Sequence, residues 1–439
     1  MTSPSSFPGN ALSAWSGNGP RSAYLAGVGG TGMRGLATFL LQNEWQVFGA
    51  DRQALAAEDR LFEWGLQWCA SPEEIPVCSL AIRSAAVPAQ DPGFAQACCQ
   101  GARPLRYAEA LGEISRQRPV LAVAGTHGKT TCSAWIAFGL RQAGIRAGYL
   151  VGGHVPQLGG SADWGENAQP LVMESCEYDR SFHQLRPRDV ALTNVEAEHP
   201  DTYPGGYEEV LQAFRRFLQG GDRKGTFWIG PEAPDLSADF PGRSQAVSGL
   251  KEGCQIGLPG RHNRQNAALV AAVLSGLGCT EAQIDFALQE FTGASRRMEA
   301  LGRFQQAEVY SDYAHHPSEV KATLQALKER HPEARLWAVF QPHQARRFQA
   351  YRQQFAPSLD QAQGLLLLEI YRARDPEALR PSVVELLAPL QARRPDRPVQ
   401  AVADWLAGRR FLEQNVKPGD LVVCLGAGDV DAFARDLAR

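Results

Sequence analysis

The chain has 439 residues, a formal net charge of −3 and 21% charged residues. This length predicts two to four domains of ~100–200 residues each, and the hydrophobic content of 44% allows each domain to bury a core. The slight negative charge argues against nucleic-acid binding, which requires a basic surface. No apolar run approaches the ~18 residues of a membrane span. Residues 1–20 lack the features of a signal peptide and predict a flexible tail, so we expect a cytoplasmic protein without a membrane partner.

The nine cysteines predict neither a disulfide framework nor a zinc site. Their number is odd, and no two of them have the C-x-x-C spacing. Zinc sites and disulfide scaffolds both show regular cysteine spacings. We therefore expect reduced structural thiols, as is usual for a cytosolic protein.

The first segment, 21–118, predicts the start of a doubly wound parallel sheet. A strand over 22–28, a glycine turn, a helix over 33–42 and a strand over 46–50 follow one another. The glycine turn can bind a pyrophosphate. Asp51 lies beyond it at about the distance in sequence at which dinucleotide-binding folds have the acidic residue that binds the ribose. Because the match to G-x-G-x-x-G is partial, a general pyrophosphate site is favoured over a dehydrogenase, and a tight turn without a ligand remains an alternative. The loop residues are Gly27, Val28, Gly29, Gly30, Thr31, Gly32 and Met33.

The second segment, 119–297, opens with a strand that leads into another glycine loop and a helix over 129–143. Glycines let backbone N–H groups close around phosphate oxygens, and the helix N-terminus adds partial positive charge. Lys129 supplies a cation for the β- and γ-phosphates, and the Thr130 hydroxyl can bind Mg²⁺. Val123 stands where the usual pattern has its first glycine, so the loop is a shortened variant. The loop predicts nucleoside triphosphate binding through Gly125, Thr126, His127, Gly128, Lys129, Thr130 and Thr131.

Strands and helices continue to alternate to the end of the chain. Strands are predicted over 171–174, 190–194, 226–229, 309–311, 336–340, 364–370 and 421–425, and helices over 207–218, 265–276 and 281–291. Pro317 suits the first turn of a further helix. The alternation predicts three α/β domains, with hinges near Pro119 and Arg297. These are an N-terminal Rossmann-like domain at 21–118, a central P-loop ATPase-like domain with a mainly parallel sheet at 119–297, and a C-terminal Rossmann-like domain at 298–439.

Two side chains in the central segment follow predicted strands. Glu174 ends one strand and His199 comes shortly after another. Because the carboxyl ends of parallel strands face the ligand crevice, Glu174 can hold Mg²⁺ beside a triphosphate. His199 can bind a second metal ion or orient a phosphate. Each residue alone would be read as a cap or a surface group, but two such residues in a P-loop sheet favour a metal site.

Together these motifs resemble the Mur ligase family, which builds the peptide of bacterial peptidoglycan on a UDP-sugar carrier. The resemblance implies an ATP-dependent amide ligase that works through an acyl phosphate. It is strongest for the branch that adds L-alanine to UDP-N-acetylmuramate. We expect the protein to be a monomer or a weak homodimer. A murein tripeptide recycling ligase and an inactive nucleotide-binding relative are the alternatives. The motifs, in the family's order, are 27–33, 125–131, 174–182, 193–203, 260–266, 296–297, 312–317 and 340–343.

The resemblance also implies roles for individual residues. ATP and one or two Mg²⁺ ions are the expected cofactors, with Mn²⁺ as a substitute. The implied catalytic residues are Lys129, Glu174, His199 and Arg297, and the metal ligands are Thr130, Glu174 and His199. ATP would also contact the 125–131 loop, His262, Asn263, Asn266 and Asp312. The UDP-substrate would contact Gly27, Gly29, Gly30, Thr31, Gly32, Met33, Asp51 and Ser84, and the amino-acid and muramyl pocket would contain Tyr313, His315, His343 and Arg347.

The chain departs from the family pattern at four positions. Glu198 stands where an aspartate is usual, Cys176 replaces an acidic residue, Gln344 replaces an arginine, and Arg83 replaces a serine. Cys176 bears on the metal site and Arg83 on the UDP site. No lysine lies between His199 and Gly221, which agrees with the alanine-adding branch.

The attacking amine must be uncharged, so the reaction calls for a proton acceptor. His315 and His343 have the side chain whose ordinary pKa lies nearest neutrality. A backbone cap for His315 and a phosphate contact for His343 are the alternatives. The sequence does not decide between the two histidines, nor does it decide between L-alanine, glycine and L-serine as the added amino acid.

Overall fold

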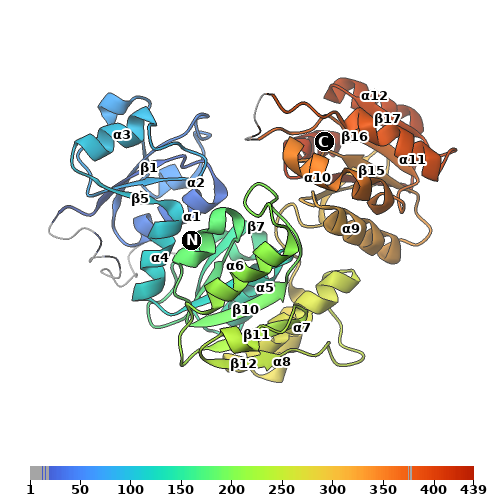
Figure 1. The fold of residues 1–439 in the computed structure, drawn as a ribbon. Coiled ribbons are helices and arrows are strands. Elements are labelled where there is room, and N and C mark those ends of the chain that lie inside the picture. Colours follow the sequence, from blue (N-terminus) through green and yellow to red (C-terminus); the bar gives the residue numbers. More distant parts are fainter. Residues whose placement is uncertain (1–11, 13–14, 16–18, 374, 376–377) are drawn as a thin grey trace. The chain divides into compact units, whose positions relative to one another are not determined.

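The computed structural model describes residues 12, 15, 19–373, 375 and 378–439, and its strands form three sheets (Figure 1). The predicted α/β class with three sheets is confirmed. The chain divides into two compact units. The first unit is Met1–Ala197, Tyr207–Gln255 and Asn266–Phe291, and the second is Glu198–Gly206, Ile256–Gln265 and Thr292–Arg439. The expected hinge near Pro119 lies inside the first unit, whereas the one near Arg297 lies close to the junction at Thr292. The domain limits from the sequence remain predictions.

The first sheet is wholly parallel, with the order β3-β2-β1-β4-β5. The predicted first strand is too long, because Gly27 adopts a φ of 84° and turns the chain out of the sheet. Of the predicted tail, Leu12 and Trp15 are buried, and Trp15 packs edge-on against Trp45; its other residues up to 18 lie outside the described part. The strands are β1 Ser22–Ala26, β2 Gln46–Ala50, β3 Gln67–Trp68, β4 Leu80–Arg83 and β5 Arg103–Arg106; the helices are α1 Thr31–Gln42, α2 Arg60–Glu63, η2 Pro72–Glu74, α3 Pro92–Cys99 and α4 Tyr107–Gln117.

The central sheet has the order β12-β11-β10-β6-β9-β7-β8 and is parallel except for the β7–β8 hairpin. The fully buried β6 lies in the middle, which places the loop that follows it among the ends of its neighbours. The strands are β6 Val120–Ala124, β7 Gly148–Val155, β8 Gly160–Asp163, β9 Leu171–Glu174, β10 Asp189–Asn194, β11 Thr226–Glu232 and β12 Arg243–Ala246. The helices are α5 Lys129–Gln142, η3 Pro156–Leu158, η4 Tyr178–Gln184, α6 Tyr207–Leu218, η5 Ser237–Asp239, α7 Arg261–Gly276 and α8 Glu281–Glu290.

The first two sheets are packed together within the first unit. Helix α1 contacts the β7–β8 hairpin, where Leu150 approaches Gly35 so closely that a Cβ atom there would collide with it. Helix α4 contacts η4, and a Cβ atom on Gly112 would lie 2.6 Å from the carbonyl oxygen of Gln184. Between the two sheets, Arg118 donates hydrogen bonds to carbonyl groups of the 164–169 loop. These contacts join the N-terminal and central sheets into one body.

The third sheet has the order β13-β14-β18-β15-β16-β17 and is parallel except for β13. Strands β15, β16 and β18 are fully buried, because their apolar side chains are covered on both faces. The strands are β13 Glu299–Phe304, β14 Ala307–Asp312, β15 Leu336–Phe340, β16 Gly364–Leu368, β17 Val399–Val402 and β18 Leu421–Leu425. The helices are α9 Pro317–Arg330, α10 Ala345–Ser358, η6 Val383–Leu386, α11 Leu387–Arg393, α12 Trp405–Asn415 and α13 Val430–Leu437.

Two further expectations from the sequence can be compared with the structure. All nine cysteines are free, as predicted. Within the described part of the chain, no helix combines the length and apolarity needed to cross a membrane.

Candidate active site

The glycine loop after β1 is tied to the residues that were predicted to surround it. Gly29 donates its N–H to Oδ2 of Asp51 at 2.9 Å, and Arg52 donates its N–H to the other carboxylate oxygen at 2.7 Å. A Cβ atom on Gly27 would lie 2.8 Å from Oγ of Ser84. Asp51 thus holds the loop through the N–H of Gly29. Helix α1 then starts at Thr31 without a side-chain cap, so its first N–H groups suit an anion.

The loop after β6 requires glycine at two positions. Gly125 and Gly128 have φ values of 139° and 79°, which L side chains rarely adopt. A Cβ atom on Gly125 would collide with Oγ1 of Thr193, and one on Gly128 would lie 2.6 Å from Oδ1 of Asn266. The predicted ATP residue Asn266 therefore lies directly against the predicted phosphate loop.

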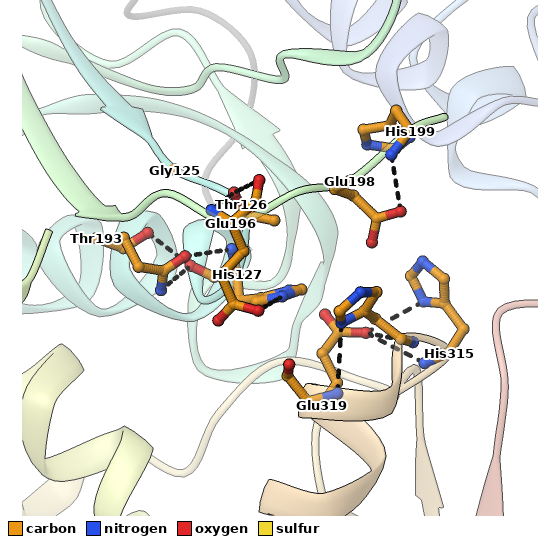
Figure 2. Close-up of polar contacts among 12 residues, drawn as sticks. Gly125, Thr126, His127, Thr193, Glu196, Glu198, His199, His315 and Glu319 are labelled. Carbon is orange, nitrogen blue, oxygen red and sulfur yellow. Dashed lines mark hydrogen bonds and ion pairs between the residues drawn. The ribbon is translucent and has the colours of Figure 1, made fainter. Parts of the chain in front are cut away.

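Strand β10 fixes the backbone of this loop (Figure 2). Thr126 N–H donates to the carbonyl of Asn194 at 3.1 Å, and His127 N–H donates to its side-chain oxygen at 2.9 Å. The hydroxyl of Thr193 donates to the carbonyl of His127 at 2.6 Å. Because the loop is already held in shape by the protein, a phosphate does not have to order it.

Lys129 lies at the start of α5 and is held by three acceptors. Its Nζ donates to the carbonyls of Gly125 at 2.6 Å and Thr126 at 2.8 Å, and to Oε2 of Glu177 at 2.9 Å. Burial lowers the pKa of Lys129, but Glu177, together with the weaker influence of Cys176 and Glu174, outweighs burial and holds the pKa above its usual value. Lys129 is therefore a fixed cation at the predicted phosphate loop. Sequence reasoning gave Glu177 no role, although its position just after β9 marks it as a residue of this edge.

The structure brings Thr130 and Glu174 together, as predicted. The Thr130 hydroxyl donates to Oε1 of Glu174 at 2.9 Å, and the N–H of Gly152 donates to Oε2 at 2.5 Å. A hydroxyl and a carboxylate are the hard oxygen ligands that Mg²⁺ prefers. The donor set therefore fits the cation that a triphosphate brings with it. The neighbouring Cys176 is exposed.

In the second unit, Arg347 is the centre of a buried polar cluster. Its Nε donates to Oε1 of Glu198 at 3.0 Å, and both side chains are only 4% exposed. Its terminal nitrogens lie 3.4 Å from Nδ1 of His199 and 3.3 Å from Nδ1 of His343. Burial raises the pKa of Glu198, but Arg347 and the nearby histidines outweigh burial and hold it well below its usual range. Glu198, which replaces the usual aspartate, has the length needed to reach this arginine.

The predicted pocket residues of the second unit form a continuous row of rings. Ring centroids are 5.3 Å apart for Tyr313 and His315, and 5.8 Å apart for His315 and His343. His343 also stacks on Tyr371 at 5.6 Å, and the guanidinium group of Arg297 lies 5.1 Å from the ring of Tyr313. Tyr371 was missed in the sequence because it follows a strand without a recognisable motif.

Asp312, the predicted ribose ligand, also supports the backbone. Its two carboxylate oxygens accept the N–H groups of Met298 at 2.7 Å and Ala314 at 2.8 Å. Burial raises its pKa above the usual value. The side chain orients the segment that contains Tyr313 and His315.

The remaining predicted residues are divided between the two units. His262 and Asn263 belong to the second unit, with His199 and Arg297, whereas Asn266 belongs to the first. Asn263 donates to the carbonyl of Pro259 at 2.8 Å, and burial lowers the pKa of His262 to about 4. The structure therefore brings Thr130 and Glu174 together in one unit and His199 and Arg347 together in the other. A shared metal site of Glu174 and His199 remains a prediction.

Two family models match the chain. One, described as the catalytic domain of the Mur ligase family, matches residues 23–119, and one described as the Mur ligase glutamate ligase domain matches residues 296–428. A UDP-N-acetylmuramate–L-alanine ligase from Chloroflexus aggregans is 34% identical over 94% of this chain and 96% of its own length. The chain belongs to the Mur ligase family. An enzyme of the same description from Symbiobacterium thermophilum is 33% identical over 95% of this Mur ligase and 94% of its own length.

Solved structures show the same fold for this Mur ligase. The UDP-N-acetylmuramate-alanine ligase of Thermotoga maritima aligns with a TM-score of 0.77 and 22% identity, covering 95% of this chain and 98% of its own. A murein peptide ligase from Psychrobacter arcticus aligns with a TM-score of 0.69, the same identity and the same coverage. At this identity the two structures support the fold alone. The first glycine loop and the row of rings both lie in segments that the family models match.

Proposed function

We propose that this Mur ligase joins L-alanine to UDP-N-acetylmuramate, with conversion of ATP to ADP and phosphate, in the synthesis of peptidoglycan precursors. Curated relatives of this description match nearly the whole chain at 32–34% identity. The observation that carries the chemistry is the arrangement of Lys129, Thr130 and Glu174 around a preformed phosphate loop. That arrangement suits phosphoryl transfer from a triphosphate.

The reaction must first turn a carboxylate into an electrophile. A carboxylate repels a nucleophile through its negative charge, whereas an acyl phosphate has a good leaving group. Transfer of the γ-phosphoryl group collects negative charge on its equatorial oxygens. Lys129 offers a buried positive charge for these oxygens, and the loop N–H groups need no reorganisation when that charge develops. We assign Gly125, Thr126, His127, Gly128 and Thr131 to the same phosphate site, with Asn266 beside it.

Thr130 and Glu174 would hold Mg²⁺, with His199 as the ligand of a second ion if two are bound and Mn²⁺ as a substitute. When bound, the cation neutralises the charge on the phosphate oxygens. The hydroxyl and the carboxylate have a mutual orientation fixed by α5, β9 and the N–H of Gly152.

The remaining groups would bind the organic substrates. We assign the glycine loop 27–33, with Asp51 supporting it and Ser84 beside it, to the UDP pyrophosphate. His262, Asn263 and Asp312 would face the nucleoside of ATP, and Arg297 would contact phosphate or substrate. Tyr313, His315, His343 and Arg347 would line the amino-acid and muramyl pocket. We place the enzyme in the cytoplasm, as a monomer or a weak homodimer.

One assay tests the proposal. ADP release should require UDP-N-acetylmuramate, and L-alanine should give a higher kcat/KM than glycine or L-serine. Preference for the recycled murein tripeptide would instead assign a murein tripeptide recycling ligase. Binding of ATP without ADP release for any of these substrates would assign an inactive relative.

A dehydrogenase is disfavoured by the geometry of the first glycine loop. Asp51, the residue that would meet a ribose in such an enzyme, accepts backbone N–H groups with both carboxylate oxygens. Quenching of nicotinamide fluorescence by the purified protein would contradict this conclusion and favour a dehydrogenase.

A further inference from the structure

The proposed reaction needs a group that takes a proton from the amine, and two histidines of the second unit are candidates. His315 and His343 are neighbours whose rings meet edge to face. A neutral imidazole has one nitrogen with a hydrogen and one with a lone pair, and the partner of one nitrogen decides the role of the other. The hydrogen-bond partners of the two rings therefore distinguish them.

His315 is bound through Nδ1 to groups that can only accept. Nδ1 lies 2.8 Å from the carbonyl oxygen of Tyr313. It also lies 3.4 Å from Oε2 of Glu319 (Figure 2). A carbonyl has no hydrogen to give, so Nδ1 must carry one. Nε2 of His315 then has the lone pair and is the nitrogen that can receive a proton.

His343 has the opposite arrangement. Its Nδ1 lies 3.3 Å from Nη1 of Arg347, and a guanidinium group can only donate. Nδ1 of His343 is therefore the acceptor and Nε2 carries the hydrogen. In this tautomer His343 can donate a hydrogen bond to a substrate, but it has no second lone pair with which to take a proton.

We propose that His315, with its tautomer set by the carbonyl of Tyr313, is the catalytic proton acceptor for the amine of the amino acid, and that Glu319 is the positioning residue that holds the ring and its backbone in place. The inference rests on the proposed ligase function. Glu319 also accepts the N–H groups of His315 at 3.1 Å and of His316 at 3.3 Å, so one carboxylate fixes both the ring and its backbone at the start of α9. The arrangement follows the general logic in which an acidic group orients a histidine and stabilises its imidazolium form.

The proton transfer accompanies amide formation. The neutral amine, having lost one proton to solvent, attacks the carbonyl carbon of the acyl phosphate; the C–N bond forms and the carbonyl π electrons move to oxygen. Nitrogen becomes acidic once it carries the fourth bond, and its proton passes to Nε2 of His315. The carbonyl then re-forms, the bond from carbon to the phosphate oxygen breaks, and phosphate leaves. His315 returns the proton to phosphate or solvent.

The surroundings keep His315 in the receptive form. Burial lowers its pKa to about 4, Glu319 and Glu198 oppose this shift, and Arg347 adds to it. The ring is therefore neutral at physiological pH. The groups around it are Tyr313, Glu319, Glu198, His343 and Arg347.

The test separates proton acceptance from acyl phosphate formation. Hydroxylamine is largely uncharged at neutral pH and traps an acyl phosphate as a hydroxamate without needing a base. His315→Asn keeps a donor near the position of Nδ1 and lacks Nε2. We expect its kcat with L-alanine to fall by ~10²–10⁴-fold, the usual contribution of general base catalysis, with little change in KM. Its hydroxamate yield from UDP-N-acetylmuramate and ATP should persist.

Three variants complete the experiment. His343→Gln, which retains a donor near Nε2, should lose less kcat than His315→Asn. Glu319→Gln should lower kcat with L-alanine but spare the hydroxamate yield, whereas a merely structural role in capping α9 would lower both together. His331→Asn, at the other end of α9, is the control and should change neither.

The outcomes are distinct. Wild-type kcat with L-alanine in His315→Asn, or an equal or larger loss in His343→Gln, would overturn the inference. Absence of hydroxamate with the wild-type enzyme would instead overturn the proposed ligase function.

Discussion

The hydroxyl of Thr130 and the carboxylate of Glu174 lie 2.9 Å apart, although 44 positions separate them in the chain. Glu174→Gln keeps the size of the side chain but removes the charge that a cation requires. We expect kcat to fall by ~10²–10³-fold, the loss typical for one electrostatic group of an active site. ADP release measured over a range of Mg²⁺ concentrations tests this, with the exposed Glu166→Gln as control. Equal Mg²⁺ dependence in the variant and the wild type would contradict the metal assignment.

Lys129 and Glu177 form a buried ion pair whose members depend on each other. Lys129→Met should abolish ATP turnover and leave Glu177 as a buried charge without its cation, at a cost of ~3–5 kcal/mol in the free energy of unfolding. The double variant with Glu177→Leu should recover stability without recovering turnover. Urea unfolding and ADP release measure the two effects separately. An unchanged free energy of unfolding in Lys129→Met would show that the ion pair contributes little to stability.

Arg347 and Glu198 form a second buried pair, in the other unit. Arg347→Met should destabilise the second unit by ~3–5 kcal/mol, because the glutamate is then buried without a partner. Adding Glu198→Leu to that variant should restore much of the loss. Thermal unfolding of the single and double variants gives the coupling energy. If the stability losses of Arg347→Met and Glu198→Leu simply add in the double variant, the two residues are not coupled.

The buried side chain of His262 should make the free energy of unfolding depend on pH. The pKa of His262 is lowered to about 4 in the folded chain, whereas its value in an unfolded chain is about 6.5. Between these two pKa values the unfolded state binds more protons than the folded state. The contribution of His262 to the free energy of unfolding is therefore complete above the pKa of the unfolded chain, and it is lost as the pH falls toward the pKa of the folded chain. His262→Gln should reduce the slope of unfolding free energy against pH by up to ~1.4 kcal/mol per pH unit. His331→Gln serves as the control, and equal slopes for the wild type and His262→Gln would refute the prediction.

The sequence was a good guide to the elements that carry regular patterns. Five of the predicted elements have the predicted limits, those over 46–50, 171–174, 207–218, 336–340 and 421–425. They have clear periodicity or an unbroken apolar run between turn residues. The β7–β8 hairpin was missed, because the three glycines within β7 and Pro156 after it weaken the alternation that marks a strand.

The partners of the functional residues were harder to predict than the residues themselves. Lys129 and Thr130 follow from the glycine loop, because their chemistry depends on local spacing. The roles of Glu177 and Glu319 depend on where their carboxylates lie in the folded chain. Distant segments place the first and the start of a helix places the second, and no short sequence pattern encodes either position. The choice between His315 and His343 likewise depends on which atoms face Nδ1, so it required coordinates.

The hairpin strand β7 has a further consequence through two residues in its middle. Leu150 packs against α1, the helix that starts at the first glycine loop, and Gly152 two residues later binds Glu174 beside the second loop. One strand therefore connects the two predicted phosphate-binding loops. The distance between these two loops is therefore set by residues of the protein interior.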